Sequence, residues 1–158
     1  MTAVTARAID LPDETATAAL ATALAAHARQ GDVIGLSGPL GSGKTTFARH
    51  FIGARIGASE VPSPTFTLVE TYQPETGPPI WHFDLYRIEM PEDAYELGIE
   101  DAFADGIALI EWPERLGTLM PREHLQVALA AGKGEQARIA TLSPSPVWAE
   151  RIAELMHG

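Results

Sequence analysis

A glycine-rich loop, GPLGSGKTT at residues 38–46, restricts the possible folds of this chain more than any other feature of its sequence. The loop matches the pattern G-x-x-x-x-G-K-[ST] at all of its fixed positions, which are Gly38, Gly43, Lys44 and Thr45. The apolar run before it, VIGL at 33–36, predicts a buried strand, and apolar spacing after it predicts a helix over 43–56. A strand, a loop and a helix in this order form a P-loop, whereas the alternative, a simple glycine turn, needs neither flank.

The residue types of the glycine-rich loop suit the phosphates of a nucleoside triphosphate. Glycines let backbone N–H groups turn towards phosphate oxygens, Lys44 is expected to reach the β- and γ-phosphates, and the Thr45 hydroxyl to bind Mg²⁺. No guanine-reading Asn-Lys-x-Asp segment is present, which favours ATP by default. The expected nucleotide-binding residues are Gly38, Gly41, Ser42, Gly43, Lys44, Thr45 and Thr46.

Two carboxylates are candidates for a second metal-binding or catalytic role. Glu111 follows the apolar run 107–110, and the tip of a buried strand is where the metal-binding acid of a P-loop protein lies. Asp84 is expected within a strand that continues past it, where it either positions the attacking water or holds Mg²⁺ through water. The alternative for Asp84 is a structural pair with Arg87 or His82. The expected metal ligands are Thr45, Glu111 and Asp84, and how the two acids divide their roles stays open.

Three further residues are candidates with a structural alternative. Thr65 lies in VPSPTF, between the loop helix and the next strand, where a P-loop switch senses the γ-phosphate; the alternative is a capped turn. Glu14 is a candidate for the nucleotide pocket, although a charge that favours the start of a helix is the preferred interpretation. Trp112, next to Glu111, is either functional or a packing residue. The five histidines show no metal-ligand spacing.

The order of expected elements predicts an α/β fold. Strands are expected at 5–11, 32–37, 66–72, 80–86, 107–112, 125–130 and 137–142, and helices at 12–29, 43–56, 91–98 and 147–156. Strands that alternate with helices and also form hairpins predict a P-loop NTPase-like three-layer sandwich. Its central sheet is expected to be mixed and mainly parallel, with antiparallel hairpin additions. We expect residues 1–158 to form a single P-loop ATPase domain.

The charge and composition of the chain restrict its partners and location. The net charge is −10, and nine acidic residues lie between Arg87 and Arg115 without a Lys or Arg among them. Nucleic-acid-binding proteins carry a basic face instead, so we expect no direct contact with DNA or RNA. The acidic stretch is either a solvated surface or a docking face for a basic partner. Without cysteine, a signal-like start or a long apolar run, the chain is expected to be cytoplasmic, with no membrane contact.

Taken together, the motifs resemble those of the TsaE family, also called YjeE, of tRNA threonylcarbamoyladenosine synthesis. The resemblance rests on LPDE, GPLGSGKTTFAR, SPTFTLVETY, HFDLYRI, ELGIEDAF and LIEWPER, which occur in the family's order over about residues 11–116. The later part matches only loosely, through ARIATL. The resemblance implies a P-loop fold, ATP binding with Mg²⁺, and functional positions at Thr65, Asp84, Glu111 and Trp112.

The resemblance also implies partners. Family members work with TsaD- and TsaB-type proteins, which build threonylcarbamoyladenosine beside the anticodon, so tRNA is met only through that complex. ATP turnover then looks like a slow reset step rather than the transfer chemistry. Two other functions stay open: a small-molecule kinase, for which the chain lacks an arginine-rich lid, and a nucleotide-gated binding protein that does not hydrolyse. No arginine is singled out as a neighbour of the phosphates.

Overall fold

A seven-stranded sheet forms the centre of the computed structural model, which describes residues 6–57 and 68–157. Its strands are β1 (Arg7–Leu11), β2 (Val33–Ser37), β3 (Val69–Tyr72), β4 (Ile80–Asp84), β5 (Ile107–Glu111), β6 (Leu125–Ala131) and β7 (Arg138–Ser143). The helices are α1 (Glu14–His27), α2 (Lys44–Ile56), α3 (Ile99–Asp105) and α4 (Pro146–His157), with the 3₁₀ helices η1 (Pro91–Leu97) and η2 (Pro113–Leu119). All of these elements except α3 and η2 correspond to segments predicted from the sequence.

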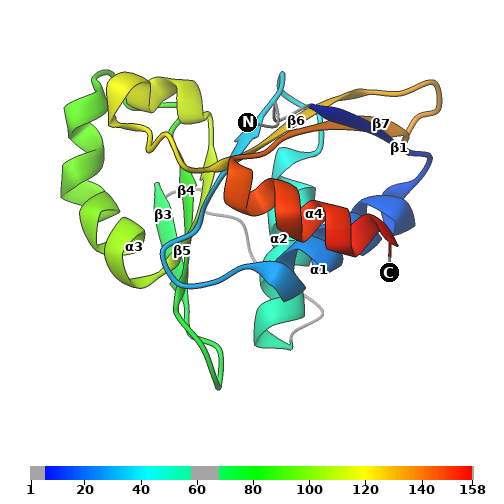
Figure 1. Ribbon diagram of the computed structural model, residues 1–158. Coiled ribbons are helices and arrows are strands. Elements are labelled where there is room, and N and C mark those ends of the chain that lie inside the picture. The colour runs from blue at the N-terminus through cyan, green and yellow to red at the C-terminus, as the bar shows by residue number, and fades with distance from the viewer. Residues whose placement is uncertain (1–5, 58–67, 158) are drawn as a thin grey trace.

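The sheet is mixed, with a parallel centre and antiparallel edges. Its strands follow the order β1-β7-β6-β2-β5-β4-β3 (Figure 1). The four central strands β6, β2, β5 and β4 run parallel to one another. On one side β7 pairs antiparallel with β6 and β1 with β7, and on the other side β3 pairs antiparallel with β4. This arrangement confirms the predicted mixed sheet with hairpin additions.

Helices cover both faces of the sheet, which gives the three layers predicted from the sequence. Helices α1, α2 and α4 lie on one face, and α3 with the two 3₁₀ helices lies on the other (Figure 1). Strand β5 serves both sides: Ile107 and Leu109 belong to the core under α1 and α2, while Ala108 and Ile110 belong to the core under α3. A central parallel strand is buried on both faces, which explains its unbroken apolar run.

The region after β4 differs from the sequence-based prediction. The helix expected at 91–98 is the 3₁₀ helix η1, and a separate helix, α3, follows it directly. Gly98 separates the two in a left-handed conformation, with φ of 84°. A Cβ at Gly98 would lie 3.1 Å from the Trp81 ring, so both the turn and the packing favour glycine there. The sequence does not show that Gly98 packs against Trp81, so it does not reveal that the helix is divided here.

The helices are short and belong to the packed layers. Asp13 caps α1, since its Oδ1 accepts a hydrogen bond from the Ala16 N–H at 2.8 Å. No helix in the described residues has the length and apolar character needed to span a bilayer.

Candidate functional site

The candidate residues come together at the carboxyl ends of three adjacent parallel strands. The glycine-rich loop follows β2, Glu111 ends β5, and Asp84 ends β4. Glu111 lies opposite Leu36 of β2 on one side and opposite Asp84 on the other. In open α/β sheets this edge is where ligands bind. The prediction that the strand continues past Asp84 was therefore wrong.

A turn explains why β4 ends at Asp84. The Asp84 Oδ1 accepts a hydrogen bond from the Tyr86 N–H at 3.2 Å, which turns the chain away from the sheet. The next residues close a further turn, in which the Ile88 N–H donates to the Leu85 carbonyl oxygen at 3.3 Å. Asp84 and Glu111 consequently occupy equivalent positions at the ends of neighbouring strands.

The glycine-rich loop has a backbone that side chains would obstruct. Gly38 has φ of 140°, and a Cβ there would collide with the Leu129 carbonyl oxygen. Gly43 caps α2 in a left-handed conformation, with φ of 99° and no side-chain hydrogen bond. The amide N–H groups in the first turn of a helix have no partner within the helix. Those of α2 are therefore available to an anion, which the helix dipole also favours.

Lys44 lies inside the loop rather than in solvent. It is only 5% exposed, and its Nζ donates hydrogen bonds to the carbonyl oxygens of Gly38 and Pro39. The ammonium also lies 3.8 Å from the centre of the Trp112 ring, within the range of a cation–π contact. Burial lowers the pKa of Lys44, and the nearby carboxylates of Glu111, Glu114 and Asp84 oppose that effect. Lys44 thus lies inside the loop, beside carboxylates that favour its charged form.

Thr45, Glu111 and His82 form a buried chain of hydrogen bonds. The Thr45 hydroxyl donates to Glu111 Oε1 at 2.9 Å, and His82 Nε2 lies 2.7 Å from Glu111 Oε2. Glu111 is 2% exposed and His82 is fully buried. Both oxygens of the carboxylate are therefore held, one by the first turn of α2 and one by β4. The alternative interpretation of Asp84 was a structural pair with Arg87 or His82, and His82 bonds to Glu111 instead.

Asp84 lies at the same end of the sheet in a partly desolvated position. Burial raises the pKa of Asp84, the Glu111 carboxylate raises it further, and the hydrogen bond from Tyr86 opposes both. Its Oδ2 has no hydrogen-bond partner among the described residues. A carboxylate whose charge is disfavoured, and whose second oxygen has no partner in the described part of the chain, is suited to bind a cation or to accept a proton.

The oxygens of Thr45, Glu111 and Asp84 are the groups here that could hold a metal ion. In the described part of the chain, no group of three or more His, Cys, Asp or Glu side chains is arranged to bind a metal unaided. Mg²⁺ is commonly held by one or two carboxylates, with water and substrate phosphates completing its octahedron. The residues present therefore fit a magnesium ion that arrives with a phosphate ligand.

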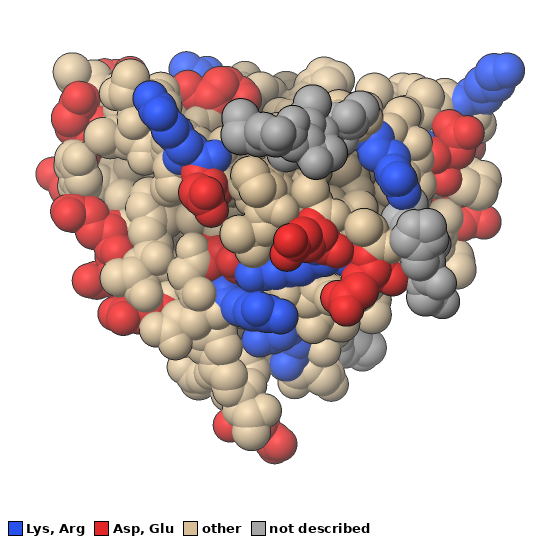
Figure 2. Space-filling model, in the orientation of Figure 1, with Lys and Arg blue, Asp and Glu red and all other residues tan. Residues whose placement is uncertain are grey.

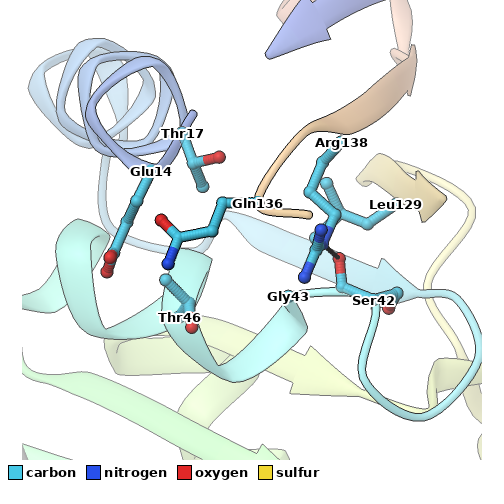
Figure 3. Close-up of a pocket in the computed structure, with 8 residues that line it drawn as sticks. All are labelled: Glu14, Thr17, Ser42, Gly43, Thr46, Leu129, Gln136 and Arg138. Atoms are coloured by element: carbon cyan, nitrogen blue, oxygen red, sulfur yellow. Dashed lines mark hydrogen bonds between the residues drawn. The ribbon is translucent and has the colours of Figure 1, made fainter. Parts of the chain in front are cut away.

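Two adjacent hollows lie beside the loop. The first, of about 280 Å³, is lined by residues 40–46 together with Asp84, Glu111, Trp112 and Arg138. The second, of about 150 Å³, lies between the start of α1, the loop and the β6–β7 hairpin (Figure 3). Its lining residues are Glu14, Thr17, Ser42, Gly43, Thr46, Leu129, Gln136 and Arg138. The two hollows share Ser42, Gly43, Thr46 and Arg138, so they lie next to each other.

Arg138 borders both hollows and holds the loop. Its Nε donates to the Ser42 carbonyl oxygen at 3.0 Å, as drawn in Figure 3, and a terminal nitrogen donates to that of Gly41 at 3.3 Å. The sequence singled out no arginine here, because Arg138 belongs to ARIATL, the segment with the loosest family match. Arg138 begins β7, and β7 lies two strands away from β2, which precedes the loop. Its place beside the loop therefore depends on the order of the strands in the sheet.

The other candidate residues have different outcomes. Glu14 is in the first turn of α1, as the charge interpretation requires, and also lines the second hollow, where its Oε1 lies 3.3 Å from His50 Nε2. Thr65 and the VPSPTF segment lie outside the described residues. His82 was named only as a possible structural partner of Asp84, and its bond to Glu111 was missed, because a lone histidine in a strand carries no spacing signal. The only sign of it in the sequence is that it lies two residues before Asp84.

The sequence and the fold both match known proteins. The family "Threonylcarbamoyl adenosine biosynthesis protein TsaE" matches residues 11–140. A protein of Rickettsia felis, named tRNA threonylcarbamoyladenosine biosynthesis protein TsaE, is 34% identical over 158 residues, covering 90% of each chain. One of Bacillus subtilis with the same name is 36% identical, covering 81% of this chain and 78% of its own. The crystal structure of Bacillus subtilis YdiB superposes with a TM-score of 0.80 at 28% identity, covering 99% of this chain and 98% of that one.

Proposed function

Because the chain belongs to the family of the threonylcarbamoyl adenosine biosynthesis protein TsaE, we propose that it is the ATP-hydrolysing accessory protein of that tRNA modification. The observation that carries the proposal is the junction of the glycine-rich loop with Asp84 and Glu111 at the ends of adjacent strands. A phosphate-binding loop, two carboxylates and a hydroxyl at one sheet edge are the parts that phosphoryl transfer to water needs.

Lys44 supports phosphate binding through the contacts it makes without a ligand. Its ammonium donates hydrogen bonds to two carbonyl oxygens of its own loop. Phosphate oxygens are stronger acceptors for an ammonium than carbonyl groups, because the hydrogen bond is then charged on both sides. Lys44 would therefore exchange these carbonyl oxygens for the phosphate oxygens of a bound triphosphate. The phosphates would also accept hydrogen bonds from the N–H groups in the first turn of α2.

The carboxylates support a metal-assisted hydrolysis. Mg²⁺, when bound with the nucleotide, would neutralise charge on the phosphates. Thr45 and Glu111 would hold the ion directly or through water, a role that their shared hydrogen bond supports. Asp84 would orient the attacking water with its Oδ2, and its raised pKa makes it a better proton acceptor. This division of roles is the one that the geometry favours.

The second hollow is proposed to take the sugar and base. It continues from the phosphate end past Arg138 and Thr46 to Glu14 on α1. Glu14 and Gln136 offer polar groups at its far side, which fit the edges of a base better than a bare apolar slot would. ATP remains the proposed nucleotide because the guanine-reading tetrapeptide is absent.

The surface charge supports an indirect role in tRNA modification. Acidic side chains line the edge of the molecule formed by η1 and α3, at the left of Figure 2. Such a surface repels the tRNA backbone and favours a basic protein partner. We therefore propose that TsaD- and TsaB-type proteins bind the chain and that tRNA is contacted only through them. Low turnover is proposed for the isolated chain. Arg138, the arginine beside the loop, is already bonded to loop carbonyl groups and so is not available to stabilise charge on the phosphates.

A phosphate-release assay tests the proposal. ATP is added with Mg²⁺ to the chain alone, to the chain with TsaD- and TsaB-type proteins, and to each mixture with GTP as competitor. We expect slow release alone, at least about tenfold faster release with the partners, and little competition from GTP. Phosphate transfer to an added small molecule would favour a kinase instead. Tight ATP binding without release under any condition would favour a nucleotide-gated binding protein.

The Lys44–Trp112 contact predicts an optical signal for binding. In a variant with Trp81→Phe and Trp148→Phe, the remaining Trp112 should change its fluorescence with Mg²⁺-ADP, because Lys44 leaves the ring. A non-hydrolysable ATP analogue should give a different signal, since only it offers the γ-phosphate that Lys44 is proposed to reach. Trp112 is also the only described non-glycine residue with positive φ, 61°, a conformation that stores local strain and is common at ligand sites.

The control for this signal removes the ammonium group of Lys44 and keeps an unbranched apolar side chain in its place. Lys44→Met in the same background should start from the altered Trp112 emission and respond little to ADP. A response equal to that of the lysine protein would show that the signal does not come from Lys44.

A further inference from the structure

His82 is buried in a way that core packing alone does not explain. It lies on β4, with no exposed surface, and points to the same side as Ile80, towards α2. Its ring makes one hydrogen bond, from Nε2 to Glu111 Oε2 at 2.7 Å. The other ring nitrogen, Nδ1, has no partner among the described residues. An apolar side chain would fill this space without leaving a buried polar atom unpaired, which costs stability.

The hydrogen bond determines what His82 can do for Glu111. An ionised carboxylate only accepts hydrogen bonds, so Nε2 is the donor. Glu111 has three rotatable side-chain bonds, and with Oε2 held by His82 its other oxygen stays on the Thr45 hydroxyl. The three residues come from β4, β5 and α2, so the carboxylate is fixed from two sides.

Without His82, Glu111 would keep only the bond to Thr45. It could then rotate its second oxygen towards Lys44 or the hollow. The two carboxylates, already at paired positions of neighbouring strands, would compete for the same cation.

We propose that His82 is a positioning residue that fixes Glu111 for the metal-bearing nucleotide. It acts through Glu111 and touches neither nucleotide nor metal. The inference rests on the proposed function, because it assumes that Glu111 serves the metal ion. Groups that hold a ligand carboxylate in place commonly account for 10–100-fold in metal affinity. The effect should therefore appear in the Mg²⁺-dependent part of nucleotide binding and leave the Mg²⁺-free part unchanged.

Two amide variants separate positioning from packing. In His82→Gln the side-chain amide can reach the place of Nε2 and still donate to Glu111, whereas in His82→Asn it is too short to do so. Calorimetric titration with ADP, once with Mg²⁺ and once with EDTA, gives the ratio of the two affinities for each protein. We expect this ratio to fall about tenfold in His82→Asn and by less than about threefold in His82→Gln. The affinity in EDTA should stay within about twofold of wild type in both.

Control variants exclude a general weakening of β4. Ile80→Val removes one methylene group from the same face of the same strand, away from Glu111, and should leave the ratio unchanged. In a Glu111→Ala background the His82→Asn change should have no further effect on the ratio, because the carboxylate it acts through is absent. Thermal unfolding of each variant confirms that the protein titrated is folded.

The results distinguish failure of this inference from failure of the proposed function. If His82→Asn lowers both affinities equally, or if His82→Asn and His82→Gln share the wild-type ratio, then His82 is a packing residue and the inference is wrong. If His82→Asn lowers the ratio as much in the Glu111→Ala background, then His82 does not act through Glu111. If the wild-type protein binds ADP neither with Mg²⁺ nor with EDTA, the proposed nucleotide site, and with it the proposed function, is wrong.

Discussion

Replacing Lys44 by alanine should lower the affinity for ATP and for ADP by about 100-fold, while the protein stays folded. The loss corresponds to about 2.7 kcal/mol, which is in the range of one charged hydrogen bond to phosphate. The fold should survive because Lys44 bonds only to carbonyl groups of its own loop and lies over Trp112. Isothermal calorimetry with each nucleotide, together with thermal unfolding, measures both parts of the prediction.

The chain contains a matched control for this variant. Lys133, the only other lysine, is exposed in the β6–β7 turn, and Lys133→Ala removes the same charge from the protein. It should leave the affinity within about twofold, because an exposed charge at a distance is screened by salt. Wild-type affinity in a folded Lys44→Ala protein would mean that the glycine-rich loop is a structural turn and not a phosphate site.

Changing Asp84 to asparagine should abolish most hydrolysis and leave binding nearly intact. Positioning and deprotonation of water by such a group commonly contribute 10²–10⁴-fold, so we expect at least about a 100-fold lower rate. Glu111→Ala should act differently: it should reduce the Mg²⁺ dependence of nucleotide binding, because Glu111 is held on Thr45. Calorimetry with and without Mg²⁺ and phosphate release in the presence of the partners separate the two phenotypes.

Stability provides an internal check on the Asp84 variant. The folded-state pKa of Asp84 is raised, so its ionised form opposes folding at pH values above that pKa, and the effect disappears as the carboxyl becomes protonated. The neutral amide should therefore leave the melting temperature at pH 7 unchanged or higher. If Asp84→Asn instead loses Mg²⁺-dependent binding while Glu111→Ala binds normally and does not turn over, the two acids have exchanged roles.

The sequence predicted those parts of the site that are local in the chain. The glycine-rich loop and its two flanking elements occupy consecutive residues, and their conformations follow from glycine and from apolar spacing. Glu111 was also placed correctly, because an apolar run that stops at an acid indicates the end of a buried strand. These signals need no knowledge of which strands are neighbours.

Contacts between distant strands could not be predicted in the same way. Thr45 and His82 are 66 and 29 residues from Glu111 along the chain, and they meet it only because β2, β5 and β4 are adjacent in that register. The end of β4 depends on a turn made by one Asp84 oxygen, which an alternating pattern does not reveal. Arg138 reaches the loop across β6, so its role depends on the strand order.

In mechanical terms, the pairing of β1 with β7 governs how a pulling force would reach the site. The ladder runs from Arg7 opposite Leu142 to Leu11 opposite Arg138. Once α4 has detached, a force applied before β1 and after β7 acts on the Arg7–Leu142 end of this ladder. The hydrogen bonds between β1 and β7 then break one after another from that end. Arg138, whose guanidinium holds the glycine-rich loop, is in the last pair to separate. A protein-unfolding machine that pulled on both ends would thus detach the whole of β1 before it loosened that loop.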